Sequence, residues 1–332
     1  MSVPTTTDLL AAARRGDEDA FRRLVEPFRA DLHALCYRML GSVQDAEDAL
    51  QDTLLRAWRG LPRFEERASL RTWLHRIATN ASLDLSARRP KRVLPIDYGP
   101  PGDPHDGPGE PLIESVWVEP YPDEHLGYEQ RESVELAFVA ALQHLPPNQR
   151  AVLILREVLG YSAREVAEAL DTTVASVNSA LQRARKAIGE RLPQRSQQAT
   201  ARSLGDRRMR EMVASYLDAW ERGDVEALAA MLSDEALIAM PPMASWFAGR
   251  EEVAAFLQWA FDQRGGTGAR ILPSRANGQL AFGSYRWNDG AQAYRAHVLQ
   301  VITLDDEGRI TDITGFVDGA LFPSFGLPAE LR

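Results

Sequence analysis

Four carboxylates lie close together in the segment GSVQDAEDALQDTLLRAW, which begins at position 41. Within about two turns of an expected helix, the segment carries Asp45, Glu47, Asp48 and Asp52. The apolar residues that follow end in Trp58. A negative helical face is repelled by nucleic-acid phosphate but is attracted to a basic protein surface. The simplest alternative is a solvated acidic face on a stable helix.

A second polar group lies in the segment SLRTWLHRIATN, which begins at Ser69. One expected helix there carries Arg71, Trp73, His75, Arg76 and Asn80, and a run of basic residues follows at positions 88–92. Basic side chains neutralise phosphates without regard to sequence, whereas aromatic and amide groups suit an unstacked base of a single strand. Apolar neighbours favour a core position for Trp73 over a stacking platform.

A helix-turn-helix pattern follows later in the chain, where two short helical patterns meet at residues 170–173. The glycine usual in this turn is absent, so Asp171 must take its place. The second helix, residues 174–186, would lie in the major groove, where Asn or Gln can read adenine and Arg can read guanine. Its outward side chains are expected to be Ser176, Asn178, Ser179, Gln182, Arg183 and Lys186. If no helix-turn-helix preceded them, the basic residues of the second helix would be better interpreted as a solvated basic face.

The C-terminal part holds groups that could perform acid–base chemistry. Proton abstraction beside a carbonyl needs a positioned base and an oxyanion donor, and the candidates are Tyr216, Tyr285, His297 and Asp312. His297 is expected to share a strand face with Leu299 and Val301, which favours a pocket-lining or satisfied histidine over a base. Neither a His–Asp pairing nor metal-ligand spacing is evident. We therefore predict no catalytic residue, cofactor or metal.

Aromatic and methionine residues in the same region supply material for an apolar pocket. Most of them are expected to form core. The residues predicted to line a ligand pocket are Tyr216, Trp220, Trp246, Tyr285 and His297. The phenylalanines of the C-terminal tail, at 316, 322 and 325, are expected to fold back as a latch.

Four segments of different character position these groups. Helical periodicity predicts all-α domains over residues 1–92 and 131–195. Residues 93–130 hold eight prolines, five glycines, nine acidic residues and no Lys or Arg, which predicts a linker without a packed core. Residues 196–332 show helices followed by period-two segments, so a separate α+β domain is expected there.

Local signals predict several helix boundaries within the first domain. Gly41 is expected to end one helix and Ser42 to cap the next. Pro27 should kink or restart the helix around it.

Composition narrows the class of protein. The 332 residues carry a net charge of −9 and one cysteine, Cys36, so an internal disulfide is excluded. Neither an apolar run of membrane-spanning length nor a secretion signal is present. We therefore expect a cytoplasmic protein with no membrane partner.

Taken in order, these segments resemble the extracytoplasmic-function (ECF) class of bacterial sigma factors over roughly residues 8–195. The acidic helix, with Gln51, Thr53 and Ala57, resembles the second region of that family, and SLRTWLHRIATN resembles its promoter-melting, −10-reading segment. LPPNQRAVLILREVLGYSAREVAEAL with RARKAI resembles the fourth region, which reads the −35 element. The C-terminal part resembles the SnoaL-like branch of the NTF2-like cone fold. WVEP at 117–120 resembles a motif of the subgroup that carries such a domain.

The resemblance implies roles for residues at matching positions. Contacts to the clamp helices of the largest core polymerase subunit are carried over to Asp48, Gln51, Asp52 and Trp58. Contacts to the −10 element are carried over to Arg76, Asn80, Arg88 and Arg89. The six outward side chains of residues 174–186 would read the −35 element. Family members often have a basic residue in place of Asn178, which implies lower phosphate affinity or a different −35 preference.

The implied function is promoter-specific transcription initiation, and not enzymatic catalysis. Core RNA polymerase, including its −35-side flap, and promoter DNA are the expected partners. The C-terminal domain would modulate activity in cis, with an unspecified small-molecule ligand as a further candidate partner. The linker is expected to thread towards the polymerase active channel. Two alternatives stay open: an isomerase- or cyclase-like enzyme fused to a helix-turn-helix regulator, and an ordinary helix-turn-helix regulator, which would not need the first helical block.

Overall fold

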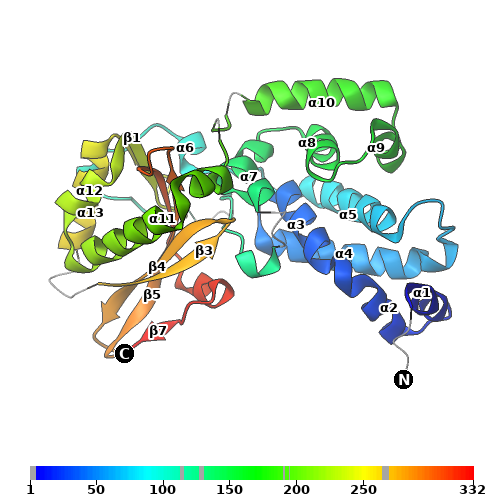
Figure 1. The fold of residues 1–332 in the computed structure, drawn as a ribbon, viewed down its shortest axis with the longest axis horizontal. Coiled ribbons are helices and arrows are strands. Elements are labelled where there is room, and N and C mark those ends of the chain that lie inside the picture. Colours follow the sequence, from blue (N-terminus) through cyan, green and yellow to red (C-terminus); the bar gives the residue numbers. More distant parts are fainter. Residues whose placement is uncertain (1–4, 113–115, 127–130, 190, 194, 264–268) are drawn as a thin grey trace. The chain divides into compact units, whose positions relative to one another are not determined.

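A computed structural model describes residues 5–112, 116–126, 131–189, 191–193, 195–263 and 269–332 (Figure 1). The chain divides into two compact units. Unit 1 comprises Met1–Lys91, His125–Gly127 and Val139–Leu192, and unit 2 comprises Arg92–Glu124, Tyr128–Phe138 and Pro193–Arg332. In the part of the chain that is described, no helix is long and apolar enough to cross a membrane.

The first half of unit 1 is a bundle of helices whose ends follow local sequence signals. The side chains of Ser42 and Ser69 accept backbone N–H bonds at two helix starts, and the expected cap at Ser42 is confirmed. Gly41, with φ of 70°, ends a helix as predicted. A 3-10 turn at Glu26–Phe28 restarts the chain around Pro27. The helices are α1 (Thr6–Arg14), α2 (Glu18–Val25), α3 (Arg29–Leu40), α4 (Val43–Gly60) and α5 (Leu70–Ser86).

The second half of unit 1 contains the predicted helix-turn-helix. Its elements are α8 (Pro147–Leu153), a π-helical turn (Ile154–Val158), α9 (Ala163–Ala169) and α10 (Val174–Gly189), after α7 (Leu136–Gln143) at the boundary of the units. Ser162 and Glu165 form a capping box at the start of α9. Asp171 has φ of 48°, so it takes the left-handed conformation that glycine usually supplies, as predicted.

Unit 2 is built on one mixed sheet in the strand order β2-β1-β6-β5-β4-β3, with β7 paired to β5. The pairs are antiparallel except β1 with β6. The strands are β1 (Leu232–Ala239), β2 (Trp246–Ala248), β3 (Arg270–Ala276), β4 (Gln279–Asn288), β5 (Ala293–Leu304), β6 (Ile310–Phe316) and β7 (Glu330–Leu331). Helices α11 (Gln197–Arg222), α12 (Val225–Ala230) and α13 (Arg250–Asp262) pack against the sheet around one core (Figure 1). The expected α+β architecture is confirmed.

The C-terminal tail folds back on this sheet, as predicted, but Phe316 is the last residue of β6 and not part of the tail. The tail forms a 3-10 helix at Gly319–Phe325, in which Phe322 is fully buried and packs on Tyr285 with ring centroids 5.2 Å apart. Gly283 lies so close to the tail that a Cβ there would be 2.5 Å from Leu327 Cδ1. Phe282 of β4 faces the core that lies between the sheet and the helices. Because side chains alternate along a strand, Gly283 and Tyr285 lie on the other face of the sheet, and the tail covers that face.

The acidic, proline-rich segment does not form the unpacked linker that its composition predicts. Residues 92–124 belong to unit 2, with a short helix α6 (Pro95–Tyr98) and 3-10 turns at Pro104–Asp106 and Asp123–His125. Tyr121 is fully buried; its N–H donates to Asn277 Oδ1 at 2.8 Å, and the Asn277 N–H donates to the Tyr121 carbonyl at 2.8 Å. The prediction from composition was wrong because a segment with few apolar residues can still pack when a folded domain supplies the surface on which those residues are buried.

The boundaries of the units therefore differ from those expected. Residues 131–138, assigned to the second helical domain from the sequence, lie in unit 2. Residues 113–115 and 127–130 of the expected linker lie outside the described residues.

Candidate functional site

The acidic surface of unit 1 is formed by α4. Asp48 is exposed and Asp52 is partly exposed, whereas Asp45 is buried. Two arginines offset part of this charge. Arg56 pairs with Asp52 at 2.7 Å, and Arg89 lies 3.2 Å from Asp45 and 3.7 Å from Asp48. Arg89, expected to contact the −10 element, is thus held by Asp45 and by Asp48, which is one of the expected polymerase contacts.

The acidic surface also contains a leucine that was not predicted from the sequence to be a contact residue. Leu55 is 54% exposed, and it follows the exposed Gln51 by about one helical turn. An apolar group surrounded by polar ones matches the anatomy of protein interfaces, and the four-residue spacing from Gln51 could have revealed it. Trp58, in contrast, packs edge-on against Phe21 at 5.1 Å and joins the core beside α1 and α2.

The expected −10 residues of α5 and its C-terminal extension differ in their availability. Arg76 and Arg88 are exposed, and neither forms an ion pair within the described part of the chain. Asn80 is partly buried on the same helix. Trp73 stacks on Phe64 at 4.8 Å and packs against the core cluster, which supports the expected core position.

His75 links α5 to the helix-turn-helix half of unit 1. Its Nδ1 lies 2.6 Å from the Tyr161 hydroxyl, and its Nε2 lies 3.0 Å from Asp31 Oδ2. Burial alone would raise the pKa of Asp31, but the neighbouring His75 and Arg71 outweigh it and lower that pKa to about 2. His75 is therefore a buried structural residue and no candidate for a DNA contact.

Helix α10 presents the predicted −35 surface. Its buried face is Val177, Leu181, Ala184 and Ile188. All six residues predicted to face outward are exposed: Ser176, Asn178, Ser179, Gln182, Arg183 and Lys186. Among the described residues Arg183 and Lys186 have no ion-pair partner, whereas Arg185 pairs with Glu157 at 2.6 Å.

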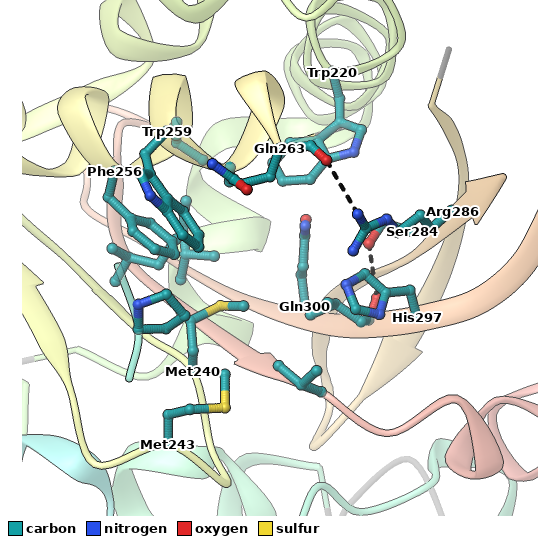
Figure 2. A pocket seen from close by; sticks show the side chains of 17 residues that line it. Trp220, Met240, Met243, Phe256, Trp259, Gln263, Ser284, Arg286, His297 and Gln300 are labelled. Atoms are coloured by element: carbon teal, nitrogen blue, oxygen red, sulfur yellow. Dashed lines mark hydrogen bonds between the residues drawn. The ribbon is translucent and has the colours of Figure 1, made fainter. Parts of the chain in front are cut away.

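Unit 2 encloses a cavity of about 300 Å³ between the sheet and α13 (Figure 2). Most of its wall is apolar, with the large side chains Trp220, Met240, Met243, Phe256 and Trp259. Its polar members are Gln263, Ser284, Arg286, His297 and Gln300. None of the described lining residues is acidic, and Pro108 of the linker contributes to the wall.

Two of the five predicted pocket residues line this cavity, and a third lies behind its wall. Trp220 and His297 line it. Tyr216 lies behind the wall, where its hydroxyl donates to Gln300 Oε1 at 2.8 Å. Tyr216 therefore orients a lining residue and does not itself meet an occupant.

The other two predicted pocket residues lie elsewhere. The Trp246 indole N–H donates to the Gly99 carbonyl at 2.8 Å, so Trp246 holds the linker. Tyr285 faces the tail, its hydroxyl donates to the Pro328 carbonyl at 2.9 Å, and burial raises the pKa of Tyr285 to about 12. Aromatic content could predict neither position, because it does not report which sheet face or loop a ring meets.

A β-bulge places His297 in the cavity. Ser284 pairs with Val298, but the next residue, Tyr285, pairs with Ala296, so His297 is an extra residue in β5. A bulge reverses the alternation of side chains and re-aims the residue it contains. The expectation that His297 shares a face with Leu299 was therefore wrong, and Figure 2 shows its ring beside Ser284 and Arg286.

The cavity lacks the parts of an acid–base site among its described residues. Burial raises the pKa of Asp312, but this carboxyl accepts a hydrogen bond from the Thr311 hydroxyl at 2.8 Å and does not line the cavity. Within the described residues, no group of three or more His, Cys, Asp and Glu side chains could hold a metal ion. The described part of the cavity wall also contains no carboxylate.

Comparison with protein families assigns each part of this architecture. Residues 24–92 match sigma-70 region 2, residues 135–188 match sigma-70 region 4, and residues 213–313 match the SnoaL-like domain. These matches assign the helical bundle with its acidic helix, the helix-turn-helix and the α+β domain in turn. The chain therefore has the architecture of a transcription initiation factor of the sigma-70 class with an added SnoaL-like domain.

The chain belongs to the ECF RNA polymerase sigma factors. It is 40% identical over 329 residues to the ECF RNA polymerase sigma factor SigG of Mycobacterium tuberculosis, covering 97% of this chain and 86% of that relative. It is 30% identical over 182 residues to SigW of Bacillus subtilis, covering 54% and 92%. The crystal structure of the ECF sigma factor SigJ of Mycobacterium tuberculosis shares the fold, with a TM-score of 0.59 and 22% identity over 91% of this chain and 98% of that one.

Family membership decides between the functions that the sequence left open. The protein is a transcription initiation factor that binds core RNA polymerase and promoter DNA, and it is not an enzyme. The enzyme fusion and the ordinary helix-turn-helix regulator are both set aside.

Proposed function

We propose that unit 1 recognises the promoter and core polymerase, and that unit 2 regulates this activity in cis through the linker. The face of α4 with Asp48, Gln51 and Asp52 binds core polymerase, with Leu55 as an apolar contact. Arg76 and Asn80 contact the −10 element, with Arg88 on phosphate. The outward face of α10 reads the −35 element. Such a protein works in the cytoplasm, where core polymerase is found.

One observation carries the regulatory part of this proposal. The linker joins the two promoter-reading halves of unit 1 along the chain, yet it is bonded to unit 2 at several points. The Trp246 indole binds the Gly99 carbonyl, and Tyr121 exchanges two hydrogen bonds with Asn277. The C-terminal domain can therefore set how freely the linker moves, and with it the separation that the two halves can reach.

Two glycines of the linker offer a matched test. Gly107 and Gly109 have φ of 72° and 74°, so alanine strains the backbone at both. A Cβ at Gly107 would lie 2.6 Å from Trp259 Cζ2, whereas a Cβ at Gly109 meets only Ser245 Oγ at 3.6 Å. Gly107→Ala should therefore loosen the linker, and Gly109→Ala should leave it docked.

The readout is run-off transcription with core polymerase and a cognate promoter. Gly107→Ala should change initiation about fivefold, which corresponds to about 1 kcal/mol in the linker equilibrium, and the sign shows whether the docked linker restrains or supports initiation. Gly109→Ala should match the parent protein. The regulatory proposal fails if hydrogen exchange shows a released linker in Gly107→Ala while transcription stays unchanged.

A further inference from the structure

We propose that the cavity of unit 2 binds a small apolar organic acid, with Arg286 binding its carboxylate and the docked linker forming part of its wall. The ligand site rests on the geometry of unit 2 alone. Its effect on transcription rests on the proposed regulatory function.

The charge of the cavity favours an anion. Arg286 is exposed at the cavity, and its guanidinium donates one hydrogen bond to the Gln263 carbonyl at 3.1 Å. A guanidinium carries five N–H donors, so a carboxylate can still be bound in the paired geometry that arginine favours. No described lining residue is acidic, so none neutralises Arg286 or attracts an ammonium group instead.

Among the deeper polar groups, Gln300 also favours an occupant with an acceptor atom. Gln300 points into the cavity (Figure 2), and its carbonyl oxygen already accepts from Tyr216. The side-chain NH₂ group of Gln300 can therefore donate a hydrogen bond to a ligand. The Ser284 hydroxyl already donates to the Val298 carbonyl at 3.3 Å, so it offers only acceptor capacity. The bulge turns His297 towards the same space.

The rest of the cavity wall favours a ligand whose main part is apolar. Trp220, Phe256 and Trp259 supply flat surfaces, and Met240 and Met243 supply flexible ones that adapt to shape. A cavity of about 300 Å³ is at the small end of ligand pockets. A compact acid with an aromatic or short aliphatic body therefore matches both the size and the chemistry.

The linker couples this site to the rest of the chain. Pro108 lines the cavity, and Gly107 lies directly against the Trp259 ring. A ligand that contacts Pro108 binds the docked linker more tightly than a released one. By linkage, the same ligand stabilises the docked linker by an equal free energy.

Isothermal titration calorimetry of the full-length protein, without polymerase, tests the site with naphthalene-2-carboxylate and its uncharged analogue naphthalene-2-carboxamide. The carboxylate should bind about tenfold more tightly than the carboxamide. Decanoate and its uncharged analogue decanamide, in a separate pair of titrations, test the same charge preference with an aliphatic body. Binding of either acid with the charge preference supports the proposal.

Variants assign the preference to Arg286. Arg286→Gln should abolish the tenfold difference between carboxylate and carboxamide. Arg207→Gln removes the same charge from an exposed position of α11, paired with Glu211 at 3.9 Å and outside the cavity, and should preserve the difference. Gly107→Ala should weaken carboxylate binding, and Gly109→Ala should not.

The proposal is overturned if neither acid binds at millimolar concentration, if the carboxamide binds as tightly as the carboxylate, or if Arg286→Gln changes nothing. Because polymerase is absent from these titrations, their failure would leave the transcription test of the linker untouched.

Discussion

At Leu55 an aliphatic side chain faces solvent on α4, about one helical turn after the exposed Gln51. If this face binds core polymerase, Leu55→Ala should weaken that complex about tenfold, because burying a leucine is worth about 1.5–3 kcal/mol. The free energy of unfolding should hardly change, since Leu55 is exposed before binding. Anisotropy of labelled protein titrated with core polymerase measures the effect.

Glu226, at an exposed site of α12, provides the control for that experiment. Because it lies in unit 2 and outside the linker, Glu226→Ala should bind core polymerase as the parent protein does. Equal affinities for Leu55→Ala and the parent protein would contradict the assignment of this face.

Glu135 gives unit 2 a dependence on pH. Burial raises the pKa of Glu135 from 4.5 to about 7, although its carboxylate accepts a hydrogen bond from the Gln198 N–H at 3.1 Å. The folded state therefore binds this proton more tightly than the unfolded state. The stabilisation is complete below pH 4.5 and is lost as the pH rises to about 7, by about 3 kcal/mol at most.

Glu135→Gln should remove this loss while keeping an acceptor for Gln198. Urea unfolding at pH 5 and pH 8 measures the free energy of unfolding in each variant. The parent protein should lose stability between these pH values more than Glu135→Gln does. Glu226→Gln, at an exposed site of α12, should behave like the parent. Parallel curves for the parent and Glu135→Gln would contradict the raised pKa.

Helix α10 carries both an arginine that is available to bind phosphate and an arginine that is already paired with a carboxylate. Arg183→Ala should weaken the holoenzyme–promoter complex about tenfold and lower the salt slope of binding by about one. Arg185→Ala, on the same helix, removes a side chain paired with Glu157 and should have a smaller effect. Filter binding of a −35 promoter across a salt series distinguishes them, and equal effects would contradict the predicted orientation of α10.

Elements whose ends are specified locally could be predicted from the sequence. Ser42 and Gly41 carry their own capping signals, and Asp171 tolerates the conformation that the turn requires. The bulge at His297 could not be predicted, because it depends on the register between β4 and β5 and not on residue type. The docking of Tyr121 was missed for a similar reason, since its partner Asn277 is remote in sequence.

For the whole molecule, the docked linker makes a prediction about its backbone dynamics. The Tyr121 N–H is bonded to Asn277 Oδ1 in a buried site, so its hydrogen exchange should be slow in the intact protein. Asn277→Gly removes this acceptor, yet glycine tolerates the φ of 56° at that position. Exchange at residues 117–121 should then accelerate at least about tenfold.

The Gly102 N–H serves as an internal reference for that measurement. It donates to the Trp246 carbonyl at 2.8 Å, at another point of the linker, and should keep its exchange rate in Asn277→Gly. Rapid exchange at 117–121 in the parent protein would contradict a docked linker.

The position of Arg89 has a consequence for the order in which the initiation complex assembles. Its guanidinium lies 3.2 Å from Asp45 and 3.7 Å from Asp48, so a DNA phosphate that drew Arg89 away would leave the exposed Asp48 with less positive charge beside it. If Arg89 contacts DNA and Asp48 contacts core polymerase, binding of either partner would therefore strengthen binding of the other. With these opposite charges paired in the free protein, we expect weaker binding to nucleic acid alone or to core polymerase alone than to the two together.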